Sequence, residues 1–233
     1  MSVVGKSGMV AEAALKSLAA LLLDLVPRAA AERASVRWKP DGSPVTNADL
    51  LFEAAIEDHL RRSLPDLQFV SEEREVRFVR DWSGWTAVVD PLDGTENFIS
   101  GIPVWGTSVS LWKEGEHQGS LLAMPEMGLQ AVTGDSPPRF TSRVAGLSSS
   151  FAGRIEGGPE SESRIFGCST FNLYLAAHGS FASFENDSGA HAWDIQAGIM
   201  IALEAGRTVH IDGQHYDATL LDPSRKHRFR VSD

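Results

Sequence analysis

The chain has 233 residues, of which 42% are hydrophobic and 22% charged, and its formal net charge is −10. These values are typical of a globular protein with a substantial core, and the acidic balance argues against non-specific nucleic-acid binding, which needs a basic surface. The single cysteine, Cys168, excludes an internal disulfide and favours a reducing compartment. No apolar run approaches the length that spans a membrane, so we expect a cytoplasmic protein.

The first predicted helix carries no chemistry of its own. Leucines at spacings of three and four predict an amphipathic helix from Met9 to Val26, which Pro27 should end or kink. The turn-rich stretch Trp38–Pro44 follows. Its Lys39 could reach a site, but a solvated loop is the favoured interpretation.

A second helix is predicted to begin at Thr46 or Asn47, either of which can cap it, and to end near Leu64. Asp49 lies in its first turn, where a negative charge is favoured by the helix dipole. Considered alone, this capping position explains Asp49 without a catalytic role.

Acidic side chains follow two predicted strands at the points where the strands end. The strand Leu67–Val70 runs into Glu72, and the strand Trp85–Val89 runs into Asp90 and Asp93. Neighbouring strand ends bring such acids together, and open α/β sheets commonly place ligands there. The repetition favours a site over a pair of unrelated surface acids.

The turn after the second strand is predicted to hold a hard cation. Pro91, Gly94 and Gly101 argue against a continuing strand or helix. The turn therefore gathers Asp90, Asp93 and the hydroxyl of Thr95 within a few residues, which is unusual for a simple surface loop.

The remaining chain is predicted to form antiparallel strands and then a shorter second half. The strands are Gly106–Trp112, Gln118–Met124 and Leu129–Thr133. Ser136–Glu162 is interpreted as loops with one short helix. A soft boundary there divides the chain into halves 1–134 and 135–233.

The second half is predicted to add two helices between short strands. Arg164–Phe166 is predicted to be a strand, and a helix begins at Gly167-Cys168-Ser169-Thr170 and runs to about Ala177. Small residues at the start of this helix have two possible roles. Ser169 or Thr170 caps the helix, or the segment contacts a phosphate or sugar. Asp194 in the first turn of a second helix is either a dipole-compensating acid or a site carboxylate. The predicted strands and second helix are Ser180–Glu185, Trp193–Glu204, Thr208–Ile211 and Phe229–Val231.

The acids together indicate a magnesium site, because Mg²⁺ prefers oxygen ligands, usually carboxylates with water and substrate phosphate. The candidate ligands are Glu72, Asp90, Asp93 and Asp194. Asp90 is the best candidate to bridge two ions, and the carbonyl of Leu92 can add a ligand. Thr95 could orient the activated water.

Three segments resemble the inositol monophosphatase superfamily of magnesium-dependent, lithium-sensitive phosphatases. They are DPLDGTENF at Asp90–Phe98, the upstream pair Glu72-Glu73, and WDIQAG at Trp193–Gly198, supported by TNAD at Thr46–Asp49 and GCSTFN at Gly167–Asn172. The resemblance implies the α/β (α+β) layered αβαβα sugar-phosphatase fold, two or three Mg²⁺ ions, a small phosphorylated substrate and a homodimer.

The resemblance also implies a role for each matching residue. Glu72, Asp90 and the Leu92 carbonyl would hold a first metal, and Asp90, Asp93 and Asp194 a second, with Glu72 holding a weaker third. Thr95 and Asp49 would position and deprotonate the attacking water. The substrate would be held by backbone N–H groups of Gly94 and Thr95, by the Gly167, Cys168 and Ser169 segment, and by Asp187.

Substrate identity is left open by departures from the family pattern. The second half is short, Ser136–Arg164 barely resembles the family, and Gln196 replaces a usual alanine. Inositol monophosphate or a similar metabolite is the first expectation. The alternatives are histidinol phosphate and 3′-phosphoadenosine 5′-phosphate. The sequence of Ile99–Thr107 is similar to that of family members that hydrolyse histidinol phosphate. A non-catalytic regulatory protein that keeps the fold is the alternative from another class, and the intact acids argue against it.

Overall fold

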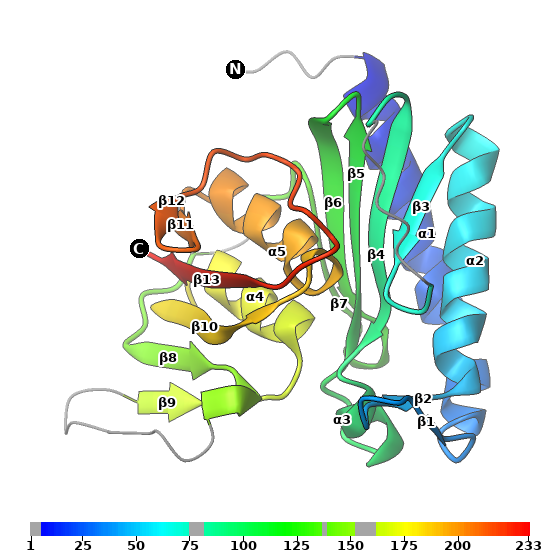
Figure 1. Ribbon diagram of the computed structural model, residues 1–233, viewed down its shortest axis with the longest axis horizontal. Helices are drawn as coiled ribbons and strands as arrows, with labels where there is room; N and C mark the ends of the chain where they lie inside the picture. The colour runs from blue at the N-terminus through cyan, green and yellow to red at the C-terminus, as the bar shows by residue number, and fades with distance from the viewer. Residues whose placement is uncertain (1–5, 75–81, 137–138, 152–161) are drawn as a thin grey trace.

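The computed structural model describes residues 6–74, 82–136, 139–151 and 162–233, which form alternating helical and sheet layers (Figure 1). The first layer is formed by the long helices α1 and α2, which pack on the first sheet. Helices α4 and α5 lie between this sheet and the second one. This arrangement confirms the expected layered α/β class. Among the described residues, no α-helix covers the outer face of the second sheet.

Helix α1 spans Lys6–Ala31 and is longer than predicted, because it continues through Pro27. A proline inside a helix removes the hydrogen bond to the carbonyl four residues earlier, here that of Leu23. Leu23 is 52% exposed, so the missing bond lies on the solvent-facing side of the helix. Helix α2 spans Asn47–Ser63 and is capped by Thr46, as predicted.

The segment between these helices is a small hairpin rather than an irregular loop. Strands β1 (Arg37–Trp38) and β2 (Pro44–Val45) pair antiparallel, and the amide of Lys39 donates to the carbonyl of Ser43 at 2.8 Å. The hairpin holds Lys39 in a fixed turn.

The first sheet has the order β3-β4-β5-β6-β7, with β3 parallel to β4 and the others antiparallel. Its strands are Gln68–Ser71, Trp85–Asp93, Gly106–Lys113, Glu116–Met124 and Leu129–Val132. Strand β4 was predicted to stop near Val89, but it continues through Pro91 to Asp93. The register with β5 shifts between Asp90 and Asp93, and such a bulge tolerates a proline because it leaves a residue outside the ladder.

The second sheet has the order β12-β11-β13-β10-β8-β9 and lies in the second half of the chain. Its strands are β8 Val144–Leu147, β9 Glu162–Arg164, β10 Ser183–Ala190, β11 Thr208–Ile211, β12 Gln214–His215 and β13 His227–Ser232. Strand β8 corrects the prediction of loops over Ser136–Glu162, of which 137–138 and 152–161 lie outside the described residues. Its central pairing with β10 stabilises a strand that has little sequence periodicity.

Two helices connect the sheets and carry the predicted site segments. Helix α4 spans Ser169–Ala177, and helix α5 spans Ala192–Glu204, as expected. A short helix, α3 (Thr95–Ile99), follows β4, and short 3₁₀ turns lie at Pro125–Met127 and Ser149–Phe151. None of the described helices is long and apolar enough to cross a membrane.

Helices α4 and α5 approach closely at Gly198, and this contact gives a stability prediction. A Cβ atom at Gly198 would lie 2.5 Å from the Cβ of Leu173. Helix propensity alone predicts that Gly198→Ala stabilises α5 by about 1 kcal/mol, whereas overpacking a core costs about 1–3 kcal/mol. We expect the clash to dominate and the melting temperature to fall. A higher melting temperature in thermal unfolding would contradict this packing.

Candidate active site

Three carboxylates from different elements converge at the end of the first sheet. Glu72 follows β3, Asp90 lies in β4, and Asp194 lies in the first turn of α5, and one oxygen from each lies within 4.8 Å of the others. The amide of Glu72 donates to the carbonyl of Val89 at 3.2 Å, which continues the β3–β4 pairing into the site. Residues far apart in the chain are therefore brought together, as the acids at the strand ends predicted.

The electrostatics of this cluster favour a bound cation. Burial raises the pKa of Asp90 well above its usual value, and the charge of Glu72 raises it further. Burial and Glu72 raise the pKa of Asp194 in the same way. Ionised carboxylates this close destabilise one another unless positive charge lies between them.

Among the described residues, Lys39 reaches the edge of the cluster with its basic side chain. Lys39 Nζ lies 3.0 Å from Glu72 Oε1 and 2.8 Å from Glu73 Oε1. Burial alone would lower the pKa of Lys39, but the two glutamates outweigh it and raise the pKa. Burial raises the pKa of Glu73 to about 7 even beside this cation. The solvated-loop interpretation of Lys39 was therefore wrong, and no local pattern in the sequence marks this contact.

Asp49 and Thr95 meet at the side of the cluster. Asp49 Oδ2 accepts hydrogen bonds from the amide and hydroxyl of Thr46, at 2.8 and 2.6 Å. Thr95 Oγ1 lies 3.4 Å from Asp49 Oδ1 and donates to the carbonyl of Leu92 at 3.1 Å. Burial raises the pKa of Asp49, although the bonds from Thr46 oppose the shift. One oxygen of Asp49 thus serves the helix cap while the other faces Thr95.

Asp194 also combines a helix cap with a place in the cluster. Its Oδ2 accepts a hydrogen bond from the amide of His191 at 2.8 Å, at the start of α5. The carboxylate also supplies an oxygen to the cluster with Glu72 and Asp90. The two roles that the sequence left open for Asp194 are therefore compatible.

Asp93 lies beside the cluster but is held by α4. Its Oδ2 accepts a hydrogen bond from the amide of Thr170, and the Cys168 thiol donates to the same oxygen at 3.2 Å. Burial raises the pKa of Asp93 to about 6, and the bond from Thr170 opposes the shift. Of the predicted metal-binding acids, Asp93 is the one that the structure places outside the group of mutually close oxygens.

Cys168 is the N-cap of α4, which corrects the expectation that Ser169 or Thr170 would cap it. The thiol sulfur accepts a hydrogen bond from the amide of Phe171 at 3.4 Å. Burial raises the pKa of the thiol well above its usual value, and the nearby Asp93 raises it further. The thiol therefore stays neutral and can donate to Asp93.

The predicted substrate segment lines a small cavity next to the acids. The cavity has a volume of about 200 Å³ and is lined by Asp93, Ser148, Ser149, Gly167, Cys168, Ser169, Asn172, Phe184 and Asp194. The sequence predicted the Gly167–Ser169 part of this wall. It did not predict Asn172 or the two serines, because Ser148 and Ser149 lie in the segment with little family resemblance.

Gly94 lies between Asp93 and Thr95, where a side chain would be strained. It adopts a left-handed φ of 85° before α3, and a Cβ there would lie 3.1 Å from the Cβ of Cys168 and 3.2 Å from the carbonyl oxygen of Val104. The backbone around Gly94 can therefore be approached closely only because it lacks a side chain.

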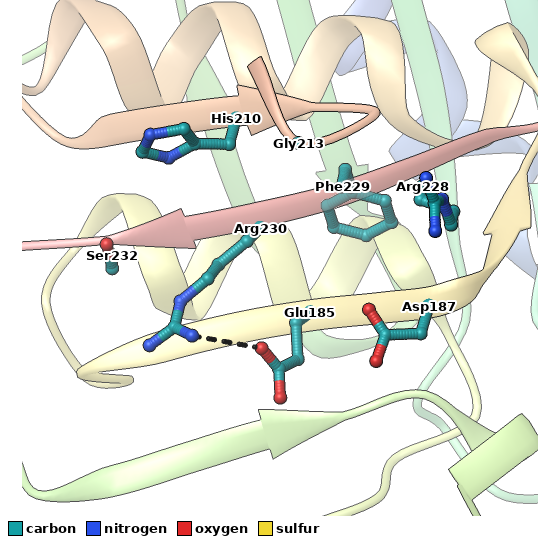
Figure 2. A pocket seen from close by; sticks show the side chains of 8 residues that line it. All are labelled: Glu185, Asp187, His210, Gly213, Arg228, Phe229, Arg230 and Ser232. Carbon is teal, nitrogen blue, oxygen red and sulfur yellow. Dashed lines mark ion pairs between the residues drawn. The ribbon is translucent and has the colours of Figure 1, made fainter. Parts of the chain in front are cut away.

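Asp187 does not line this cavity. It is an exposed residue of β10 that lines a separate pocket of about 610 Å³ on the second sheet, with Arg228, Arg230 and His210 (Figure 2). Glu185 and Arg230 form an ion pair at 3.4 Å across this face (Figure 2). A contact between Asp187 and the substrate stays a prediction.

The cluster passes a test of its fit to Mg²⁺. Its donors are carboxylate oxygens, with no sulfur or imidazole among the three close ligands. Burial and neighbouring acids raise the pKa of Asp90 and of Asp194, so uncompensated negative charge is unfavourable there. Oxygen-only, negatively charged donor sets suit hard divalent cations.

Comparison with known proteins identifies the family. The model of the inositol monophosphatase family matches residues 9–136, which include every predicted metal-binding acid except Asp194. The chain belongs to the inositol monophosphatase family. A histidinol-phosphatase of Streptomyces coelicolor is 32% identical over 212 residues, covering 77% of this chain and 78% of the relative. An inositol-1-monophosphatase of Rhizobium meliloti is 31% identical over 198 residues, covering 73% of each chain.

The family's fold is also found among solved structures. A crystal structure of an IMPase/NADP phosphatase with Mg²⁺ and phosphate superimposes with a TM-score of 0.78. The sequence identity is 17%, and the match covers 97% of this chain and 92% of the other. As a member of the inositol monophosphatase family, the protein is a phosphoric monoester hydrolase.

Proposed function

We propose that this family member is a Mg²⁺-dependent phosphomonoesterase that hydrolyses inositol monophosphate or another small phosphorylated metabolite. The observation that carries the proposal is the convergence of Glu72, Asp90 and Asp194 to within 4.8 Å. A protein without catalytic or metal-binding function has no reason to keep three mutually repelling acids so close together.

The family resemblance assigns the residues that would hold the cations, and the close approach of Glu72, Asp90 and Asp194 supports it. Glu72, Asp90 and the Leu92 carbonyl would hold one ion, and Asp90, Asp93 and Asp194 a second, with Glu72 contributing to a weaker third. Divalent cations in such sites supply positive charge to phosphate oxygens and lower the pKa of water. Thr170 and Cys168 fix the position of Asp93 by their hydrogen bonds to Oδ2.

Thr95 and Asp49 are proposed to orient the attacking water and take its proton. The Thr95 hydroxyl lies between Leu92 and Asp49, so it can accept a hydrogen bond from water. A general base is most effective when its pKa lies near the working pH, and burial shifts the pKa of Asp49 in that direction.

The substrate would occupy the cavity beside Gly94. The backbone N–H groups of Gly94 and Thr95 would contact its phosphate. The side-chain oxygen of Asn172 is buried without a hydrogen-bond partner among the described residues, so it is available to a hydroxyl or amine. Gly167, Cys168 and Ser169 would form the adjoining wall.

Histidinol phosphate is a second candidate substrate. The 32% identity with a histidinol-phosphatase supports it. The sequence of Ile99–Thr107 also supports it, because it is similar to that of family members that hydrolyse histidinol phosphate. Both candidates are small phosphomonoesters, so the proposed metal and water sites serve either of them.

A substrate panel distinguishes these candidates. Phosphate release would be measured with saturating Mg²⁺ on inositol 1-phosphate, histidinol phosphate and 3′-phosphoadenosine 5′-phosphate, and ranked by kcat/KM. We expect inositol 1-phosphate to rank first. A preference for histidinol phosphate would make it the proposed substrate in place of inositol 1-phosphate. A preference for the nucleotide would contradict both proposed substrates. No hydrolysis of any ester would contradict the proposed function.

A further inference from the structure

The turn that carries Glu72 is closed at both of its ends. Residues Ser71 to Arg74 form a tight turn in which the amide of Arg74 donates to the carbonyl of Ser71 at 3.3 Å. Glu72 and Glu73 are the two central residues of this turn. The direction of their side chains therefore depends on the positions of Ser71 and Arg74.

A single carboxylate binds the side chains of both end residues. Glu53 Oε2 accepts a hydrogen bond from Ser71 Oγ at 2.6 Å, and Glu53 Oε1 accepts one from Arg74 Nε at 2.9 Å. Glu53 is 7% exposed and Ser71 is 1% exposed, so the bond between them is not easily replaced by water. The Arg74 guanidinium also lies 5.0 Å above the ring of Phe69 in β3.

The position of Glu53 on α2 connects this turn to the water site. Glu53 lies four residues after Asp49, so both buried carboxylates point from the same side of the helix. Asp49 faces Thr95, while Glu53 binds the turn of Glu72. Helix α2 thus sets the distance between the two parts of the site.

We propose that Glu53 is a positioning residue that holds the Glu72 turn in its metal-binding geometry. The inference rests on the proposed function, because it assigns Glu72 to a cation site. It assigns to Glu53 no contact with the cation or the substrate. Partners that orient metal ligands typically affect metal affinity by about 10–100-fold when they are mutated.

A glutamine at position 53 tests this role. Gln has the shape of Glu, but an NH₂ donor replaces one of the two oxygens. In Glu53→Gln, one of the two positions that accept from Ser71 and Arg74 therefore becomes a donor. We expect the Kd for Mn²⁺, measured by electron paramagnetic resonance on the metal-free protein, to rise about 10-fold. Apparent Mg²⁺ affinity in phosphate release should fall in parallel, with less change in kcat at saturating Mg²⁺.

Two variants of the same helix serve as matched controls. Glu57→Gln removes an ion pair to Arg74 but no bond to Ser71, and Ile56→Val destabilises the buried face without touching the turn. Both should leave the Mn²⁺ Kd within about twofold, even where the melting temperature falls. If Glu53→Gln does not fold, Ser71→Ala removes one of the two bonds and keeps the ion pair between Glu53 and Arg74.

The outcomes separate this inference from the proposed function. A raised Kd confined to Glu53→Gln and Ser71→Ala supports the positioning role. An unchanged Kd in those variants, with wild-type protein that binds Mn²⁺ and hydrolyses substrate, overturns the role and leaves the proposed function intact. Wild-type protein that binds no Mn²⁺ overturns the proposed function and the positioning role together.

Discussion

Asp90→Asn should abolish phosphatase activity while stabilising the metal-free protein. Asp90 is the acid expected to contact two cations, and loss of one group that stabilises a transition state already costs about 10²–10³ in kcat. We expect kcat/KM to fall at least about 1,000-fold. Asparagine keeps an oxygen for the amide of Leu92, which donates to Asp90 Oδ1 at 3.0 Å, and it removes one buried charge from the cluster.

The stability measurement makes this prediction specific. The pKa of Asp90 is raised by burial and by neighbouring acids, so its ionised form destabilises the folded state at neutral pH. The melting temperature of metal-free Asp90→Asn should therefore rise, by about 2–4 °C for each kcal/mol recovered. Asp24→Asn makes the same chemical change on the exposed side of α1 and should alter neither quantity. Wild-type activity in Asp90→Asn would contradict the site.

Thr95→Ala should lower kcat about 100-fold, because positioned proton transfer typically contributes about 10²–10⁴. The variant removes the hydroxyl that lies 3.4 Å from Asp49 Oδ1 and 3.1 Å from the carbonyl oxygen of Leu92. The Mn²⁺ Kd should change little, because the three close carboxylates are untouched. Steady-state kinetics and Mn²⁺ binding would be measured on the same preparation.

Thr95→Ser is the matched control for the hydroxyl. Serine restores the oxygen but lacks the methyl group that restricts the threonine rotamer. We expect it to recover most of the activity, to within about 10-fold of wild type. Equal losses in the alanine and serine variants would show that shape matters at this position, and the proposed role of the hydroxyl would be wrong.

The central part of the site could be predicted from the sequence. Glu72 and Asp90 could be predicted because parallel strands that each end in acids bring those acids to one edge, and β3 and β4 do pair in parallel. Asp49 and Asp194 were ambiguous, since an acid in the first turn of a helix has a sufficient role as a cap. In the structure each residue accepts a cap hydrogen bond on Oδ2, while Asp49 also faces Thr95 and Asp194 also supplies an oxygen to the cluster. A cap and a role in the site are therefore compatible.

Other parts could not be predicted because they depend on contacts between distant segments. Lys39 reaches Glu72 only because the β1–β2 hairpin fixes its turn, and a hairpin of two-residue strands leaves almost no periodic signal. Strand β8 is stabilised by its pairing with β10 and β9 in the assembled sheet. Pro91 was expected to end β4, and the bulge that accommodates it is a property of the β4–β5 register.

The dependence of phosphate release on Mg²⁺ tests the central claim most directly. The protein would first be treated with a chelator and then titrated with Mg²⁺, using whichever substrate ranks first in the panel. We predict no measurable turnover in the metal-free protein and full recovery as Mg²⁺ is restored, because the proposed cation site is formed by Glu72, Asp90 and Asp194. Turnover that continues at the same rate after complete metal removal would contradict the assignment of these acids to metal-dependent hydrolysis.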